Sequence, residues 1–333
     1  MRKVLIALAA AFICMTAGAQ TKRMAVVQTS TCYMRLQPDY GSALETQELM
    51  GTVVEIVGQK SYWREIVSPQ PYRAWTTSMT LVEMNAEQIA AYEKTPKYIF
   101  TALYGHVFTS PDENSATICD LVGGDVMRIV EPKGSQTVPA QWVEVMLPSG
   151  EKGWTLKKNV RVLGKRVSIK KGESSQGLVS QEAIEGAIRE AMKLRGVPYL
   201  WGGMSSKGVD CSGMVRICFL MNDILLPRNA SQQVSCGKSI EIPRPDAAGL
   251  TETKVKAAYN KEKALAATKN LRRGDLVFFG NIETGRVTHV GIYLGDGMMI
   301  HSSHLVRVNS LIPGSKDYYS GSHKLIKACR LCY

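Results

Sequence analysis

The N-terminal half of the chain contains an internal repeat. Residues from Pro38 to Val57 align without a gap with residues from Pro111 to Val130, and eight of these 20 positions are identical. Each copy contains short runs of alternating apolar residues bounded by turns, a pattern typical of antiparallel strands. A repeat of one such unit predicts two copies of the same small β-barrel, one after the other in the chain.

Two pairs of tryptophans follow the same spacing. Trp63 lies 12 residues before Trp75, and Trp142 lies 12 residues before Trp154. We expect Trp75 and Trp154 to lie in the cores of the two barrels, because side chains fill the interior of a small barrel.

The segments between these units predict the domain boundaries. From Asn85 to Lys94 the residues favour a short helix, which Thr95-Pro96 ends. Glycine and serine around 172–177 indicate a linker, and a helical apolar stripe begins at about Ser180. The expected organisation is a first barrel over 24–84, a helical connector over 85–98, a second barrel over 99–165, a linker over 166–178 and a third domain over 179–333.

The first residues have the features of a secretory signal peptide. Arg2 and Lys3 precede an apolar run from Val4 to Met15, and Ala17-Gly18-Ala19 is a small-residue cleavage site. The run is too short for a membrane-spanning helix. We therefore expect residues 1–19 to be removed and the protein to be exported to the periplasm, the cell envelope or the medium, with no stable membrane insertion.

The chain is basic, with a formal net charge of +12. Export argues against nucleic acid as the partner, and an anionic cell-wall polymer fits a basic exported protein better. The sequence does not indicate an oligomeric state or a disulfide pairing.

A glycine-rich loop that leads into a helix carries the first candidate catalytic residue. Asp210 is a good N-cap, and Cys211 follows it in the first helical turn. The partial positive charge of a helix N-terminus favours a thiolate there. The alternative is a small buried cysteine in a core helix.

A predicted hairpin from Val287 to His301 carries two histidines. A three-residue turn at Gly295-Asp296-Gly297 pairs Leu294 with Met298 and puts His301 opposite Gly291, on the same face as His289. Two imidazoles that face a cysteine supply a base and an orienting group for a nucleophile. A zinc site is the alternative, but it would usually show closer ligand spacing and more sulfur. We expect neither a metal nor a cofactor.

The segment from about residue 178 to the C-terminus resembles the NlpC-type cysteine peptidases of bacterial cell walls. Six motifs appear in the family's order: Pro198-Tyr199-Leu200-Trp201-Gly202-Gly203, Asp210-Cys211-Ser212-Gly213, Leu226-Pro227-Arg228, Arg273-Gly274-Asp275-Leu276-Val277-Phe278-Phe279, His289-Val290-Gly291-Ile292-Tyr293 and Ile300-His301. The repeats are similar to bacterial SH3-like domains, whose closing Gly-Trp appears as Gly153-Trp154. The resemblance implies an α+β fold, in which two SH3-like barrels precede a papain-like domain with helices packed on an antiparallel sheet.

The resemblance also implies roles for these residues. Cys211 is the expected nucleophile, His289 the base and His301 the group that orients the base. The backbone N–H of Cys211 and, by resemblance, the hydroxyl of Tyr199 are the expected donors to the oxyanion. The other reading of Tyr199 is an ordinary core aromatic.

Relatives with two SH3-like domains cut the bond between γ-D-glutamate and a diamino acid in peptidoglycan peptides, often with a free N-terminal L-alanine. Asp210 and Ser212 match the residues that bind that amine in the relatives, although Asp210 is also an N-cap. A tyrosine of the first SH3-like domain takes part in such relatives, and Tyr40, Tyr62 and Tyr72 are candidates here. Asn229-Ala230 departs from the Asp-Ser that follows Pro-Arg in relatives.

Two other functions stay open beside this one. The first alternative is an endopeptidase of intact peptidoglycan that uses its SH3-like domains as anchors. The second is a cell-wall-binding protein without catalytic activity. The sequence does not identify the diamino acid. Between residues 237 and 270 the chain carries an insertion rich in lysine and alanine, and we expect a surface helix over 252–269 rather than a cap on the cleft.

Overall fold

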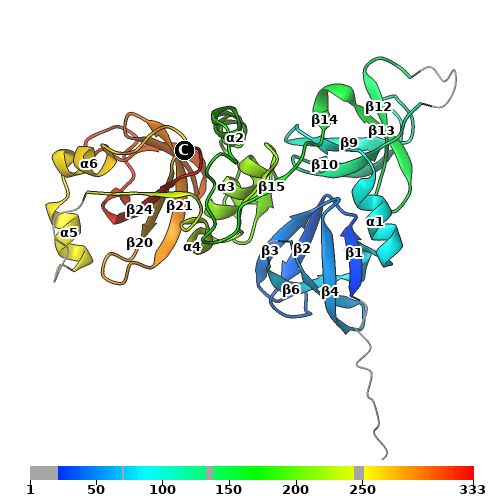
Figure 1. The fold of residues 1–333 in the computed structure, drawn as a ribbon, viewed down its shortest axis with the longest axis horizontal. Helices are drawn as coiled ribbons and strands as arrows, with labels where there is room; N and C mark the ends of the chain where they lie inside the picture. Colours follow the sequence, from blue (N-terminus) through cyan, green and yellow to red (C-terminus); the bar gives the residue numbers. More distant parts are fainter. Residues whose placement is uncertain (1–21, 70, 133–137, 244–250) are drawn as a thin grey trace, which may run out of the picture.

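The computed structural model describes residues 22–69, 71–132, 138–243 and 251–333. The predicted signal peptide lies outside the described residues, and so does the part of the 237–270 insertion from 244 to 250. Figure 1 shows two β units on one side of the molecule, a large sheet on the other, and the helices α2 and α3 between them. Among the described residues, no helix has the length and apolar character needed to cross a membrane.

The two N-terminal units have the same architecture. Each is a seven-stranded antiparallel sheet, with the order β3-β2-β6-β5-β4-β1-β7 in the first and β10-β9-β13-β12-β11-β8-β14 in the second. Each strand of the second sheet occupies the place of its counterpart in the first, which is the arrangement that the sequence repeat predicts. The architecture is compatible with SH3-like barrels.

The strands of the first unit are β1 (Arg23–Val27), β2 (Thr31–Arg35), β3 (Leu44–Leu49), β4 (Val53–Lys60), β5 (Trp63–Val67), β6 (Arg73–Thr77) and β7 (Leu81–Met84), with the 3-10 turn η1 (Ser78–Thr80). Those of the second are β8 (Lys97–Phe100), β9 (Tyr104–Phe108), β10 (Thr117–Val122), β11 (Val126–Ile129), β12 (Trp142–Met146), β13 (Lys152–Leu156) and β14 (Val160–Val162), with η2 (Lys157–Asn159). Between the units, α1 (Ala86–Lys94) begins after Asn85, whose side chain accepts a hydrogen bond from the N–H of Gln88. The expected connector helix is confirmed.

The two tryptophans expected in the barrel cores do not lie there. Trp63 and Trp142 are buried, whereas Trp75 and Trp154 are only partly buried. Along β6, Ala74 and Thr76 are buried and face the core. Because side chains alternate along a strand, Trp75 between them points to the outer face. The prediction for Trp75 and Trp154 is therefore wrong.

The third unit packs helices on one antiparallel sheet, in the order β19-β24-β20-β21-β22-β23. The predicted α+β fold class is confirmed. The sheet strands are β19 (Lys238–Ile240), β20 (Leu276–Gly280), β21 (Val287–Gly295), β22 (Met298–Ser303), β23 (Leu305–Ser310) and β24 (Leu325–Arg330). The helices are α2 (Gln181–Lys193), α3 (Cys211–Leu220), α4 (Ala230–Gln233), α5 (Glu252–Ala258) and α6 (Lys261–Thr268), with η3 (Ser322–Lys324). Two short pairs join them: β15 (Val167–Ser168) with β18 (Ile224–Leu225), and β16 (Met204–Ser205) with β17 (Gly208–Val209).

One hydrophobic core connects all three units. It contains apolar residues of α2, α3 and the large sheet, together with Leu49 of the first barrel and Ile99, Val122 and Val126 of the second. Burial of this continuous apolar surface holds the barrels against the helices.

The insertion forms two helices rather than one. Tyr259 and Asn260 separate α5 from α6, and the side chain of Asn260 caps α6 by accepting a hydrogen bond from the N–H of Lys263. α5 has no buried residue, whereas α6 buries Ala264, Ala267 and Thr268. The segment 252–269 is therefore helical as expected, but it forms two helices in place of one.

Candidate active site

The helix α3 begins at Cys211. Asp210 is its N-cap, and its carboxylate accepts a hydrogen bond from the N–H of Gly213 at 2.7 Å, as the sequence predicts. A Cβ at Gly213 would lie 2.1 Å from the carbonyl oxygen of Gly203, so only glycine lets the glycine-rich loop approach the helix start this closely. The sulfur of Cys211 is buried and accepts hydrogen bonds from backbone N–H groups.

The turn between β21 and β22 differs from the predicted one. Asp296-Gly297 forms a two-residue turn in which both residues have positive φ, 50° and 74°. A bulge at the end of β21 makes Gly295, in place of Leu294, the partner of Met298. The predicted pairing of Leu294 with Met298 is therefore wrong.

The extra residue in the bulge nevertheless restores the predicted register. His301 lies opposite Gly291. The Nε2 atom of His289 lies 2.7 Å from the Nδ1 atom of His301, which is a hydrogen-bond distance. The structure thus brings together the two histidines that the sequence places on one face.

A side chain that the sequence analysis missed continues this contact. The Nε2 atom of His301 lies 2.9 Å from Oδ1 of Asn309 on β23, and Nδ2 of Asn309 donates a hydrogen bond of 2.8 Å to the carbonyl oxygen of Asp317. His301 lies opposite Arg307 in the β22–β23 ladder, which places Asn309 one position further along the same face. The strand pairing of the next hairpin would have been the signal for finding it.

Burial dominates the protonation of the site. It raises the pKa of the Cys211 thiol to about 11, with a further contribution from the negative charge of Asp210. Loss of hydration lowers the pKa of His289 to about 3, aided by His301, and lowers that of His301 to about 4. The sequence predicts a thiolate from the helix terminus, but desolvation outweighs that effect and favours a neutral thiol beside neutral imidazoles.

Two tyrosines are electrostatically coupled to Cys211. Burial, with the charge of the cysteine, raises the pKa of Tyr199 to about 12. Tyr319, which the sequence analysis missed, packs its ring against His301 with centroids 4.8 Å apart and also has its pKa raised by burial and by Cys211. Tyr199 is therefore close enough to Cys211 for their charges to interact, and its role as an oxyanion donor stays a prediction.

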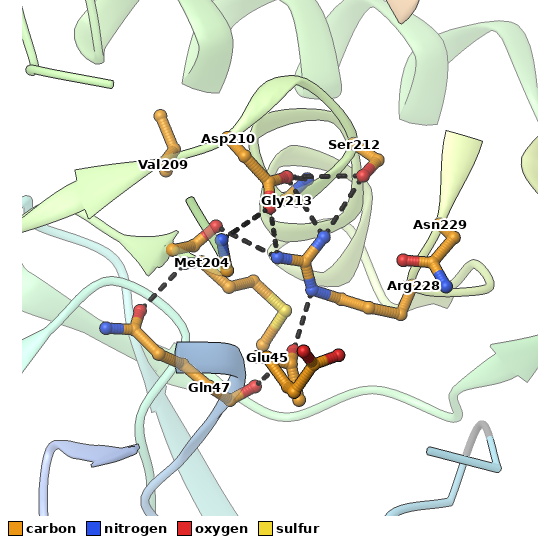
Figure 2. Close-up of polar contacts among 12 residues, drawn as sticks. Glu45, Gln47, Met204, Val209, Asp210, Ser212, Gly213, Arg228 and Asn229 are labelled. Carbon is orange, nitrogen blue, oxygen red and sulfur yellow. Dashed lines mark hydrogen bonds and ion pairs between the residues drawn. The ribbon is translucent and has the colours of Figure 1, made fainter. Parts of the chain in front are cut away.

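A buried network surrounds Asp210 (Figure 2). Its Oδ1 accepts hydrogen bonds from the hydroxyl of Ser212 at 3.2 Å and from Nη1 of Arg228 at 3.0 Å, besides the capping bond. Its Oδ2 accepts from the N–H of Gly202 at 3.0 Å and from Nη2 of Arg228. Both carboxylate oxygens are thus occupied within the protein, and Ser212 also accepts a bond from Arg228.

The first barrel reaches this network through β3, which is an edge strand of its sheet. The Nε of Arg228 donates a bond of 2.7 Å to the hydroxyl of Thr46. Oε1 of Gln47 accepts a bond of 2.8 Å from the N–H of Met204 (Figure 2). Glu48 forms a buried ion pair of 3.2 Å with Arg216 of α3. Polar groups at a sheet edge are costly to bury unless they are paired, and here the third unit supplies the partners.

Glu45 and Tyr72 of the first barrel lie beside the same network. The hydroxyl of Tyr72 donates a bond of 2.9 Å to Oε2 of Glu45, and it interacts with the side chain of Asn229. In the part of the chain that the structure describes, no cation forms an ion pair with Glu45. Of the three candidate tyrosines, Tyr72 alone makes this contact.

Tyr40 and Tyr62 instead pack with Trp63 in a cluster of rings. The centroid of the Tyr40 ring lies 5.1 Å from the centroid of the Trp63 ring, and that of the Tyr62 ring lies 5.7 Å from it. Both tyrosines are exposed.

The described residues contain no group of three or more His, Cys, Asp or Glu side chains that could hold a metal ion.

The fold and the chemistry of this site define a papain-like cysteine peptidase. Residues 196–323 match the model of the NlpC/P60 family, so the third unit is an NlpC/P60 domain. The chain is 26% identical over 296 residues to a gamma-D-glutamyl-L-lysine dipeptidyl-peptidase of Bacillus cereus, a match that covers 85% of this chain and 75% of the relative. It is 30% identical over 158 residues to a protein of the same name from Bacillus subtilis, covering 46% of this chain and 44% of that relative.

A solved structure shares the whole architecture. The crystal structure of an NlpC/P60 family protein from Bacillus cereus has a TM-score of 0.68 and covers 92% of this chain and 99% of its own, at 19% identity. At this identity the likeness shows a common fold that includes the N-terminal β units. The predicted family and fold are confirmed.

Proposed function

We propose that this protein is a cysteine endopeptidase that hydrolyses the γ-D-glutamyl–diamino acid bond of peptidoglycan peptides with a free N-terminal L-alanine, for turnover or recycling of the cell wall. The observation that carries the proposal is Glu45, a carboxylate without a cation partner among the described residues, held beside the Cys211 loop by a different unit. The names of the relatives in the two Bacillus species support the bond and the substrate class. The predicted signal peptide supports export to the periplasm or beyond.

The chemistry assigns one task to each side chain of the site. The sulfur of Cys211 attacks the γ-carbonyl carbon of D-glutamate while His289 takes the thiol proton, because the resting thiol is neutral. The backbone N–H of Cys211 and the hydroxyl of Tyr199 bind the oxyanion. His289 then gives the proton to the leaving amine of the diamino acid, and the C–N bond breaks to leave a thioester.

Water completes the cycle. His289 accepts a proton from the water as its oxygen attacks the thioester, and the sulfur of Cys211 leaves and regains that proton. The released product carries a new carboxylate on D-glutamate. His301 orients His289 and supports the positive charge that His289 carries between the steps.

The substrate amine binds between the first barrel and the catalytic unit. An ammonium group pairs with the carboxylate of Glu45, which Tyr72 holds in place by its hydrogen bond. Asp210 and Ser212 border this subsite and position Arg228, which neutralises the charge of Asp210. Glu45 thereby supplies the negative charge that Asp-Ser supplies after Pro-Arg in relatives, where this chain has Asn229-Ala230.

One digestion experiment tests the proposal. The protein without residues 1–19 is incubated with L-Ala-γ-D-Glu-L-Lys, with meso-diaminopimelate in place of lysine, with the N-acetylated form of each, and with intact peptidoglycan. We expect cleavage of the free-amine peptides at the γ-D-glutamyl bond. Equal cleavage of the acetylated peptides would contradict the amine subsite, release from intact peptidoglycan alone would favour the wall-anchored enzyme, and no product at all would favour a binding protein.

Cys211→Ala is the matched control for catalysis. Removal of the nucleophile should lower kcat by at least about 10⁴-fold, while circular dichroism stays unchanged because Ala suits the first turn of a helix. Retained turnover in this variant would contradict the mechanism.

A further inference from the structure

Asn309 is held in one orientation by a backbone carbonyl. Its side-chain amide faces Nε2 of His301 at 2.9 Å on one side and the carbonyl oxygen of Asp317 at 2.8 Å on the other. A carbonyl oxygen can only accept a hydrogen bond, so the NH₂ group must face Asp317 and the Oδ1 atom must face His301. Asn309 is 8% exposed, so water competes little for these bonds.

This orientation determines where each imidazole carries its proton. Oδ1 of Asn309 is an acceptor, so Nε2 of His301 carries the hydrogen and donates it. In a neutral ring, Nδ1 of His301 then carries no hydrogen and its lone pair accepts a hydrogen bond. Nε2 of His289, 2.7 Å away, must therefore carry a hydrogen and donate it to Nδ1 of His301. The nitrogen of His289 that is left without a proton is Nδ1.

We propose that Asn309 is a positioning residue that fixes the tautomers of both histidines, so that His289 always presents an unprotonated Nδ1 to the thiol of Cys211. This inference rests on the proposed function and adds a fourth member to the predicted Cys211–His289–His301 set. Without an acceptor at Asn309, His301 can place its hydrogen on Nδ1 and donate it to His289. His289 then carries its own hydrogen on Nδ1 and cannot take the thiol proton.

The hydrogen bonds that run from His289 through His301 and Asn309 end on the backbone carbonyl of Asp317, and no carboxylate takes part in them. When His289 becomes an imidazolium, its charge is therefore stabilised by a lone pair of His301, whose other nitrogen is polarised by Asn309. Neutral hydrogen-bonding groups stabilise the imidazolium of His289 less than a carboxylate would. His289 therefore passes its proton readily to the leaving amine.

The direct test is the nitrogen spectrum of the histidine rings in the protein without residues 1–19. Two-bond ¹⁵N–¹H correlations at pH 7 distinguish the two neutral tautomers, and the chain has five histidines to assign. We expect His289 and His301 both to carry hydrogen on Nε2. A hydrogen on Nδ1 of either ring would overturn the proposal, whatever the variants do.

Two substitutions separate positioning from simple structural support. Asn309→Ala should lower kcat about tenfold or more with KM nearly unchanged, since part of a general-base contribution is lost, and should give a second set of His289 signals protonated on Nδ1. Asn309→Asp keeps the acceptor and adds charge, so the tautomers should persist while the acid limb of kcat/KM moves to higher pH. Unchanged tautomers and kcat in Asn309→Ala would contradict the proposal.

Asn270→Ala is the matched control, because Asn270 also donates its side-chain amide to a backbone carbonyl, that of Glu241, outside the site. It should leave kcat and the histidine spectrum unchanged. The two proposals fail differently: if the wild-type protein cleaves no γ-D-glutamyl peptide, the proposed function fails, while the spectrum still decides the tautomers. If the wild type cleaves and Asn309→Ala cleaves equally well, only the role of Asn309 fails.

Discussion

The two barrels share a strand order but not a relation to the active site. In the gapless alignment of the repeat, Glu45-Thr46-Gln47-Glu48 on β3 corresponds to Ile118-Cys119-Asp120-Leu121 on β10. The first of these stretches carries Glu45 of the proposed subsite and makes three bonded contacts to the third unit. The second supplies Asp120, whose ion pair with Lys207 is partly exposed.

The next aligned pair behaves alike in both copies. Leu49 and Val122 both join the core that contains α3. The repeat therefore preserves the apolar positions that attach each barrel, while the polar positions of one edge strand determine which barrel bonds to the residues around Asp210. The shared fold places both edge strands, β3 and β10, near the helices. The side chains on each strand then decide which contacts that strand makes.

The largest expected difference between the barrels is in stability. Glu48→Ala leaves Arg216, 1% exposed, without its carboxylate, and should lower the free energy of unfolding by about 3 kcal/mol. Asp120→Ala breaks a pair that water screens, and should cost less than about 1 kcal/mol. Urea unfolding followed by tryptophan fluorescence measures both.

The double variant Glu48→Ala with Arg216→Met serves as the control for this comparison. Apolar replacement of both members of a buried ion pair is often close to neutral, so the second change should recover most of the loss. Equal costs for Glu48→Ala and Asp120→Ala would show that the two edge strands contribute alike, and the comparison would fail.

A smaller difference is expected in substrate binding. Glu45→Gln removes the charge but keeps the size of the side chain, and should raise KM for L-Ala-γ-D-Glu-L-Lys about tenfold, the usual effect of losing one charge-assisted contact. Ile118→Ala, at the aligned position of the second barrel, should leave KM unchanged. Steady-state kinetics on both variants checks this, and an unchanged KM for Glu45→Gln would remove the first barrel from the subsite.

The smallest effect is expected from Tyr72→Phe. The change removes one hydrogen bond to Glu45 and leaves the carboxylate in place, so KM should rise about threefold with kcat retained. Tyr62→Phe, in the exposed ring cluster, is the comparison within the same barrel and should have no effect. If Tyr62→Phe raised KM and Tyr72→Phe did not, the assignment of Tyr72 to the proposed subsite would be wrong.

Local patterns in the sequence reached a large part of this structure. The cap at Asp210, the start of the helix at Cys211 and the register of His301 depend on residues close together in the chain, and all were predicted. The turn at Asp296-Gly297 was predicted wrongly, because a bulge and a shorter turn give the same register as a longer turn.

The errors and omissions concern contacts between distant segments or the side of a strand that faces inward. Alternation identifies two faces of β6 but not which face is buried, so Trp75 was placed inside. Glu45 meets Tyr72 across the first sheet, and Asn309 meets His301 across the β22–β23 hairpin, whose register is not among the sequence predictions. The protonation of Cys211 depends on how many atoms of the whole fold surround it, which local sequence does not specify.

The core that joins the barrels to the helices has a consequence for the length of the substrate. Glu45 and Cys211 belong to different units, yet Leu49 of the first barrel lies in the same core as α3, so the two units pack against each other. In the proposed function, the span between a bound ammonium and the attacked carbonyl is therefore set by this packing, before any peptide arrives. A peptide with one residue more or fewer ahead of the γ-linkage would present the wrong bond to the sulfur, so the enzyme would select its cleavage point by counting from the N-terminus.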